Sequence, residues 1–209
     1  IVSSRQPDEV SHFFVHHPLV TQVLAHGATK SSVLLESGLQ CDLRVVKAEE
    51  FAFALNYFTG SKEHNIRMRN RALEAGWSLN EYRFSCAKET SDPKPPSAQD
   101  ESEIYRALKL DYVPPELRED RGEIEAAAKG NLPQLIEWTN LRGCFHNHTT
   151  ASDGKNSLEE MADAAAELGL EYLGIADHSK SSFQANGLDT KRLQQQIKAI
   201  RSINATRSD

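Results

Sequence analysis

The sequence predicts an α+β segment, then a proline-rich stretch, and then parallel βα units. Two short runs of alternating apolar residues, 32–36 and 39–46, flank Ser37-Gly38, which is a hairpin signal. Residues 87–100 contain three prolines and almost no apolar side chain, so we expect a linker or an exposed loop there. From Leu141 onward, strand and helix patterns alternate, and this order favours parallel βα units.

The other elements are expected where the apolar period changes. In the first part they are the end of a strand at 1–3, a helix from Pro7 toward Val15, helices at 49–57 and 61–75, and a strand at 79–84. Gly76 is placed to close the helix at 61–75. The later elements are helices at 101–108 and 121–129 around an extended anchor at 112–115, strands at 143–148 and 172–176, and helices at 157–168 and 190–203.

Composition places the chain among ordinary globular proteins. It has 209 residues, 39% of them hydrophobic, and a net charge of −6. No apolar run approaches the roughly 20 residues of a membrane span, and no signal peptide is visible. Three widely spaced cysteines indicate reduced thiols, so we expect a cytoplasmic protein without a membrane partner. Because the chain starts at Ile1 without a methionine, we expect a piece of a longer protein.

The net negative charge does not exclude nucleic acid, because the acidic excess is local. Residues 86–139 contain 7 Lys and Arg against 12 Asp and Glu, whereas residues 1–85 are balanced with 9 of each. A basic patch remains in the first part, formed by Lys62, Arg67, Arg69 and Arg71.

Asp42 is unusual because it lies in the middle of a predicted strand, where aspartate is disfavoured. It shares one strand face with Gln40 and Arg44. Its charge needs a partner, which is either Arg44 or a metal ion of the kind that phosphoryl-transfer sites hold. A solvent-facing Asp42–Arg44 pair is the plainer alternative.

The helix at 61–75 places Lys62, Asn65 and Arg69 on one stripe. Asn and Arg side chains suit base edges, sugar or phosphate. His64, with Arg67 and Arg71, is expected on the solvated far side. Tyr57 and Phe58 precede the break at Gly60 and are suited to stacking on a ligand. An ordinary amphipathic helix behind a buried aromatic pair would give the same pattern.

A second group of chemically active residues lies downstream. His146 and His148 alternate on a predicted strand, Asp153 follows in the loop, and Asp177-His178 ends the next strand. Parallel strand ends meet at one face, so these groups favour a metal such as Zn²⁺ or Mn²⁺ over scattered surface histidines. His12, His16, His17 and His26 show no such pattern and are expected to be structural.

Residues 38–82, with Tyr57-Phe58-Thr59-Gly60-Ser61 and the later Asn80-Glu81-Tyr82, resemble the palm and nucleotide-binding subdomain of X-family DNA polymerases. The resemblance implies that Asp42 is a catalytic carboxylate that binds Mg²⁺, with Arg44 beside it. It assigns the incoming dNTP and the DNA to a set of residues comprising Arg44, Tyr57, Phe58, Gly60, Ser61, Lys62, Asn65 and Arg69. The family's Gly-Asp-x-Asp strand belongs upstream of Ile1, so we expect no DNA synthesis by this chain alone.

Residues 143–154 and 175–179 resemble the polymerase and histidinol phosphatase (PHP) domain, a (β/α)7 barrel that hydrolyses phosphoesters with bound metals. The resemblance implies that His146, His148, Asp153 and His178 are metal ligands and that Asp177 supports a ligand from behind. Residues 110–127 resemble the joint between the two regions in bacterial and archaeal enzymes. Because only about two βα units are present, we expect weak metal binding and no efficient hydrolysis by this chain as given.

The resulting interpretation divides the chain into the palm end and nucleotide-binding subdomain at 1–85, a linker with joint helices at 86–140, and a truncated PHP domain at 141–209. The expected function is gap-filling DNA synthesis in base-excision repair with a PHP-type 3′ phosphoesterase or exonuclease. Expected partners are gapped or primed DNA and dNTP, and the protein is expected to be a monomer. Two alternatives stay open: a PHP phosphatase of a small phosphoester, and a DNA-binding module without catalysis.

Overall fold

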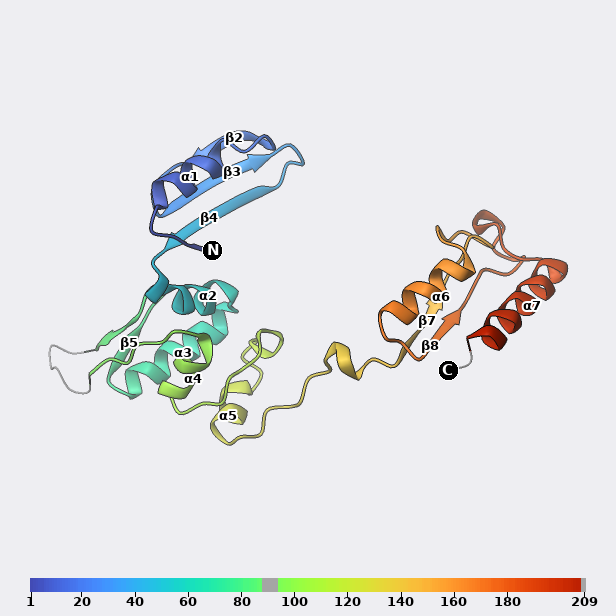
Figure 1. Ribbon diagram of the computed structural model, residues 1–209. Coiled ribbons are helices and arrows are strands. Elements are labelled where there is room, and N and C mark those ends of the chain that lie inside the picture. The colour runs from blue at the N-terminus through green and yellow to red at the C-terminus, as the bar shows by residue number, and fades with distance from the viewer. Residues whose placement is uncertain (88–93, 208–209) are drawn as a thin grey trace. The chain divides into compact units, whose positions relative to one another are not determined.

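The structure is a computed structural model that describes residues 1–87 and 94–207 (Figure 1). Contacts within the chain divide it into two compact units, residues 1–133 and residues 134–209. Each unit is described by itself. Within the described residues, no helix is both long and apolar enough to cross a bilayer.

Unit 1 begins with a four-stranded sheet in the order β1-β4-β3-β2. The strands are β1 (Val2–Ser3), β2 (Val20–Ala25), β3 (Lys30–Leu35) and β4 (Gln40–Val46). β1 runs parallel to β4, while β2, β3 and β4 are antiparallel neighbours. The predicted hairpin is therefore confirmed, with Ser32 opposite Asp42. Helix α1 (Pro7–Val15) packs on β3 and β4 through Ser11 and Val15.

The rest of unit 1 is helical, with one small hairpin. Its elements are the 3-10 helix η1 (Ala48–Glu50), α2 (Phe51–Thr59), α3 (Lys62–Glu74), β5 (Trp77–Leu79), β6 (Phe84–Cys86), α4 (Glu101–Ala107), the 3-10 helix η2 (Pro115–Leu117) and α5 (Glu123–Ala128). One apolar core joins them. Its fully buried members include Met68 of α3 and Ile104 and Tyr105 of α4. Because α4 and α5 share this core with α2 and α3, these four helices belong to one packed unit.

One expectation for this region needs correction. Residues 79–84 do not form one strand, since Leu79 ends β5 and Phe84 begins β6. Between them Asn80 accepts hydrogen bonds from the backbone amides of Tyr82 and Arg83 and so closes the turn. The loop expected at 87–100 lies partly outside the described residues. Its described part, 94–100, contains no helix or strand and is exposed or half-buried, apart from Ala98, which is buried in the core. The domain boundaries at 85 and 140 stay a prediction.

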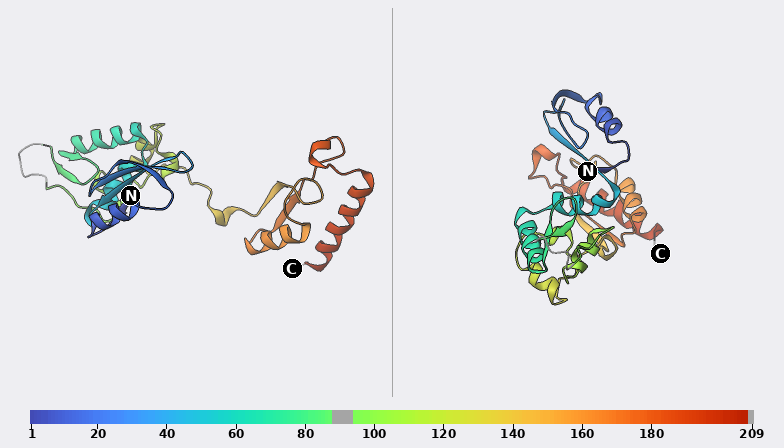
Figure 2. Two further views of the ribbon diagram at one scale, coloured as in Figure 1. Left: turned by 90° about the horizontal axis from the view of Figure 1, so that it is seen from above. Right: turned by 90° about the vertical axis from the view of Figure 1, so that its left-hand side faces the viewer.

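Unit 2 confirms the parallel βα expectation. Strand β7 (Gly143–Asn147) pairs in parallel with β8 (Tyr172–Ile175). The other elements are the 3-10 helices η3 (Trp138–Asn140) and η4 (Phe183–Ala185) and the helices α6 (Leu158–Glu167) and α7 (Thr190–Thr206). Figures 1 and 2 show both helices beside the strands, and Leu173 of β8 lines one apolar groove with Ala165 of α6 and Ile200 of α7.

The helices of unit 2 begin at side-chain caps. Ser157 accepts from the Glu160 amide while the Glu160 carboxylate accepts from the Ser157 amide, which makes a reciprocal capping box. Asp189 accepts from the Arg192 amide at the start of α7. These caps fix where the two loops after β7 and β8 end, and those loops contain the metal-ligating residue types.

Candidate functional site

The turn between α2 and α3 builds a small pocket. Gly60 has a φ of 76°, a left-handed conformation that glycine adopts without penalty, and α2 ends there. Ser61 then caps α3 by accepting a hydrogen bond from the His64 amide at 3.2 Å. The Asn65 side chain donates to the Tyr57 carbonyl at 2.7 Å and ties the two helices across the turn.

The pocket, of about 290 Å³, contains most of the residues that the sequence suggested for substrate binding. Its lining residues are Tyr57, Phe58, Gly60, Lys62, Asn65 and Arg69. The Tyr57 and Phe58 rings meet edge to face with centroids 5.1 Å apart. The pocket thus combines aromatic surface, an amide and two cations, which are groups that suit a sugar, base or phosphate.

Asp42 and Arg44 do not form the ion pair that the sequence left open as an alternative to metal binding. The Gln40 side chain donates to the Asp42 carboxylate at 3.0 Å, and this bond, with a second one from Ser32, lowers the pKa of Asp42. The Arg44 guanidinium instead lies over the Phe58 ring, 5.2 Å from its centroid, which is a cation–π contact. Arg44 therefore connects β4 to the rim of the pocket, while Asp42 remains an exposed carboxylate.

His64 is not on a solvated face as expected, because its side chain is fully buried. Its Nδ1 lies 2.7 Å from the Glu123 carboxylate and its Nε2 lies 2.9 Å from the Tyr105 hydroxyl. Burial is the main cause that lowers the pKa of His64, so the ring is neutral at neutral pH. A neutral ring then donates from Nδ1 to the carboxylate and accepts at Nε2 from the tyrosine.

This buried network continues to the pocket. Asn56 of α2 donates to both the Tyr105 hydroxyl and the Glu101 carboxylate, each at 3.2 Å. Arg118 donates to the same carboxylate at 2.7 Å, and its backbone carbonyl accepts from the Ser61 amide at 3.0 Å. The network thus holds the Ser61 turn, from which the pocket residues of α3 follow, against α4 and α5.

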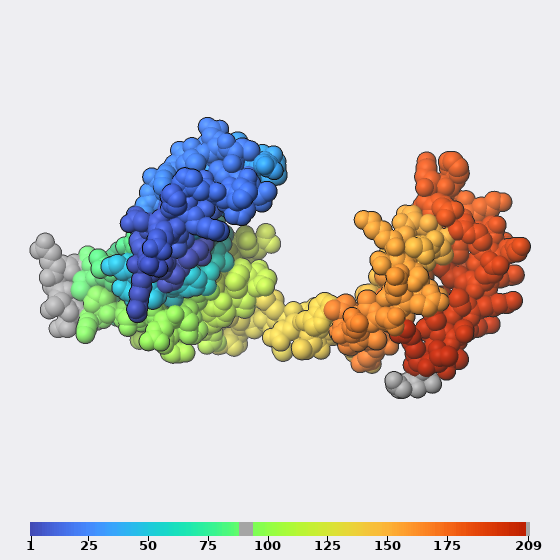
Figure 3. Space-filling view, turned by 45° about the horizontal axis from the view of Figure 1, so that its top comes forward, coloured from blue at the N-terminus to red at the C-terminus, as the bar shows by residue number. Residues whose placement is uncertain are grey.

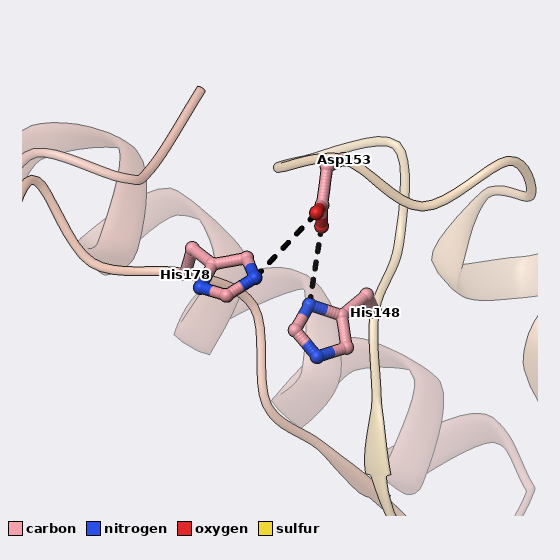
Figure 4. Close-up of side chains that lie close together, drawn as sticks. All are labelled: His148, Asp153 and His178. Carbon is pink, nitrogen blue, oxygen red and sulfur yellow. Dashed lines mark ion pairs between the residues drawn. The ribbon is translucent and has the colours of Figure 1, made fainter. Parts of the chain in front are cut away.

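The second candidate site lies at the ends of β7 and β8. His148, Asp153 and His178 each offer one ligand atom, and these atoms lie within 4.8 Å of one another (Figure 4). The Asp153 carboxylate is 3.2 Å from His148 Nδ1 and 3.5 Å from His178 Nε2. Among the described residues, no other group of three such side chains is this close together.

The donor set fits a metal ion. His148 Nδ1 is buried without a hydrogen-bond partner, although it is near Asp153 in distance. Two imidazoles and a carboxylate match the ligands of Zn²⁺ and related ions. Gly154 lets the Asp153 loop approach, since a Cβ at that position would collide with the His148 backbone.

His146 stands apart from this group of three. Its φ is 66°, and the β7–β8 register is irregular between Cys144 and Asn147. Its exposed ring lies 5.2 Å from the His148 ring, centroid to centroid, but it contributes no atom to the cluster. The simple alternation of His146 and His148 on a straight strand is therefore not observed.

Asp177 lies behind the cluster and is occupied by hydrogen bonds. Its carboxylate accepts from the Thr149 amide and hydroxyl, from Ser152 and from Gln196 of α7. Partial burial alone would raise the pKa of Asp177, but these donors outweigh burial and lower the pKa. Asp177 thus connects the β7 loop, the end of β8 and α7. The sequence showed the position of Asp177 but not its partners.

Comparison with known proteins identifies a family in each part of the chain. Residues 54–119 match the family "DNA polymerase beta thumb", and residues 145–206 match the PHP domain. The chain is 40% identical over 207 residues, which is 98% of its length, to DNA polymerase/3′-5′ exonuclease PolX of Bacillus subtilis (strain 168). The chain belongs to the X-family DNA polymerases that carry a PHP domain.

The match to this relative covers nearly the whole of this chain but only part of the relative's length. The chain spans 35% of the length of the Bacillus subtilis protein. A solved structure of Leishmania infantum polymerase beta, a ternary gap complex, matches 54% of this chain and 50% of its own at 20% identity and a TM-score of 0.46. Both the polymerase beta-like and the PHP families are metal-dependent. The two family matches establish the polymerase beta-like fold and the PHP domain, whereas a complete (β/α)7 barrel is not part of what the described residues form.

Proposed function

We propose that the protein containing this chain performs DNA-directed nucleotidyl transfer in gap-filling repair, and that its PHP domain removes or trims 3′ ends as a phosphoesterase or exonuclease. The observation that supports this most is the pocket between α2 and α3, which gathers six side chains and backbone positions of the Tyr57–Arg69 segment. The Bacillus subtilis relative is named for the same two activities.

In unit 1, Tyr57 and Phe58 stack against the sugar and base of the incoming dNTP, and Gly60 lets the nucleotide approach the backbone. Lys62 neutralises phosphate, with Ser61 fixing the start of α3. Asn65 and Arg69 reach the nascent base pair from the minor groove. Asp42 helps to hold Mg²⁺, which when bound activates the primer 3′-OH.

In unit 2, His146, His148, Asp153 and His178 hold Zn²⁺ or Mn²⁺, and Asp177 fixes the loop that carries them. The bound metal supplies an activated water and polarises the phosphoester. His146 joins the group of three by turning its ring, since it already lies next to His148. The full PHP domain closes as a (β/α)7 barrel.

The proposed partners are dNTP and gapped or primed DNA, bound by a monomer in the cytoplasm. Membership of the X-family polymerases supports these partners, as does a pocket whose aromatic, amide and cationic groups suit a nucleotide. The proposed division places the polymerase part at 1–85, the joint at 86–140 and the PHP part at 141–209.

A binding experiment on this chain tests the first half. Fluorescence anisotropy with a one-nucleotide-gapped duplex should show tighter binding when the complementary dNTP is added. Arg69→Ala should weaken that complex by about 1–3 kcal/mol. Arg67→Ala is the matched control, because Arg67 lies on the same helix but pairs with Asp120 and Glu125 outside the pocket.

Equal losses in both variants would mean that binding is only electrostatic, as in a DNA-binding module. No binding of gapped duplex, together with hydrolysis of a small phosphoester, would favour the phosphatase alternative.

A further inference from the structure

The histidines near the N-terminus, which the sequence suggests are structural, are all exposed. An open depression of about 610 Å³ lies along α1. Its lining residues are Asp8, Glu9, His12, Phe13, His16, His17, Pro18 and His26. The buried residues of α1 are Ser11 and Val15, so the histidines lie outside the contact that α1 makes with the sheet. In Figure 3 the dark-blue N-terminal segment that includes α1 faces the viewer.

His12 and His16 are one helical turn apart and lie next to each other. Their ring centroids are 4.1 Å apart, and the ring planes are inclined by 34°. Two histidines at positions i and i+4 of a helix form a known zinc-binding arrangement. Two nitrogens on one tetrahedral Zn²⁺ are separated by about 3.4 Å when each bond is about 2.0–2.1 Å. The two rings are therefore close enough for one nitrogen of each to come to that separation.

The hydrogen bond that His16 makes prepares it as a ligand. His16 Nδ1 lies 2.8 Å from the His12 backbone carbonyl. A carbonyl oxygen only accepts, so Nδ1 must be the protonated nitrogen of the neutral ring. The lone pair is then on Nε2, and a bond from the other ring nitrogen to a carbonyl is the usual way in which a metal-binding histidine is oriented.

The adjacent His17 is prepared in the opposite sense. The Leu19 amide donates to His17 Nδ1 at 3.3 Å, so Nδ1 has the lone pair and Nε2 has the proton. His17 would have to give up this bond and change tautomer to bind a metal through Nε2. The structure therefore favours His12 and His16 over His17 as metal ligands, although all three line the same depression.

We propose that His12 and His16 form a second metal site, which chelates one divalent late transition-metal ion, represented here by Zn²⁺. Water completes the coordination, because within the described residues no group of three mutually close metal-ligating side chains includes this pair. The ion would bridge the last turn of α1, and α1 packs on β3 and β4 of the sheet. This site is independent of the cluster at the ends of β7 and β8.

Equilibrium dialysis against Zn²⁺ at neutral pH, followed by elemental analysis, tests the proposal. The parent for this test is the His148→Gln/His178→Gln chain, in which the cluster in unit 2 is disabled. We expect this parent to retain one equivalent of Zn²⁺. Adding His16→Gln should weaken that binding by about 10²-fold, because the chelate is lost, and His12→Gln/His16→Gln should abolish it.

His17→Gln in the same parent is the matched control and should keep the bound equivalent. His12, His16 and His17 are exposed and glutamine favours helices, so the far-ultraviolet circular dichroism of these variants should stay the same as that of their parent. The proposal is overturned if the parent holds no Zn²⁺, if the double variant binds as much Zn²⁺ as its parent, or if His17→Gln loses the ion equally.

Discussion

At the scale of single residues, His64 is a buried polar side chain that holds distant segments of unit 1 together by hydrogen bonds. Its two ring nitrogens contact Glu123 and Tyr105, which are 59 and 41 residues away along the chain. Replacing His64 by Phe keeps an aromatic ring at this position but removes both hydrogen bonds. We expect the free energy of unfolding of unit 1 to fall by about 2 kcal/mol, since buried groups then lose a partner.

Trp77 fluorescence during urea unfolding measures this loss, in a Trp138→Phe background that leaves Trp77 as the one remaining tryptophan. Arg69→Gln is the control, because that side chain is exposed and should change the same free energy by less than about 0.5 kcal/mol. If His64→Phe is as stable as the control, the network contributes nothing to unit 1.

The same histidine predicts a pH dependence. Burial lowers the pKa of His64 below its ordinary value of 6.5, so the unfolded chain takes up a proton before the folded chain does. The stability from a neutral His64 is present above pH 6.5 and is lost as pH falls from there toward the folded pKa, with a slope of at most about 1.4 kcal/mol per pH unit. Urea unfolding of the parent and of His64→Phe at several pH values should therefore show their difference shrinking on acidification. A constant difference would contradict a neutral, buried His64.

The residue scale also shows the limit of the sequence. Periodicity places Lys62, Asn65 and Arg69 on one stripe, and the structure brings these three together in a pocket. The same periodicity puts His64 on the solvated side, which is wrong. A helical wheel describes the faces of α3 but not what covers them, and α4 and α5 cover the far face of this helix with partners that no local pattern indicates.

At the scale of elements, Asp177 connects three segments that the sequence shows only as separate pieces. Asp177→Asn would place an amide NH₂ where hydrogen bonds are accepted from Thr149, Ser152 and Gln196. Loss of such supporting bonds typically weakens metal binding 10- to 100-fold. We expect that loss in Zn²⁺ titrations, made in the His12→Gln/His16→Gln background.

The control for this element is Asp163→Asn, because Asp163 lies exposed on α6 and pairs with Arg207. It should leave Zn²⁺ affinity unchanged. An Asp177→Asn chain that binds Zn²⁺ as tightly as the control would mean that the loop is held without Asp177.

Element prediction worked best where the signal was local. Pro7, Ser157 and Asp189 mark helix starts that the structure places within a residue or two of those expected. The sequence did not indicate β2, an edge strand with mainly exposed residues, and it did not reveal the turn at Asn80 between β5 and β6. Both depend on pairing with another strand, whereas a helix start depends on its own first turn.

At the scale of the whole molecule, the boundary between the two units decides whether the two sites depend on each other. Residues 133–142 contain no α-helix or β-strand, and several apolar side chains there are exposed, with Ile136 at 80% and Trp138 at 58%. Exposed apolar residues in this stretch indicate that it shares neither apolar core. Each candidate site lies wholly within one unit, so one site should survive loss of the other.

Limited chymotrypsin digestion tests this independence, since the enzyme cleaves after large apolar residues in accessible backbone. Among the described residues, we expect the first cut after Trp138 or Leu141. The two resulting fragments should then persist longer under digestion than the intact chain does. The N-terminal fragment should keep the partly buried environment of Trp77, because the residues packed in its core end at residue 132. Trp138→Ala/Leu141→Ala should slow the first cut without changing later ones. First cleavage within α4 or α5 would instead show that these helices detach from the core, and the network around His64 would then be too weak to hold the pocket.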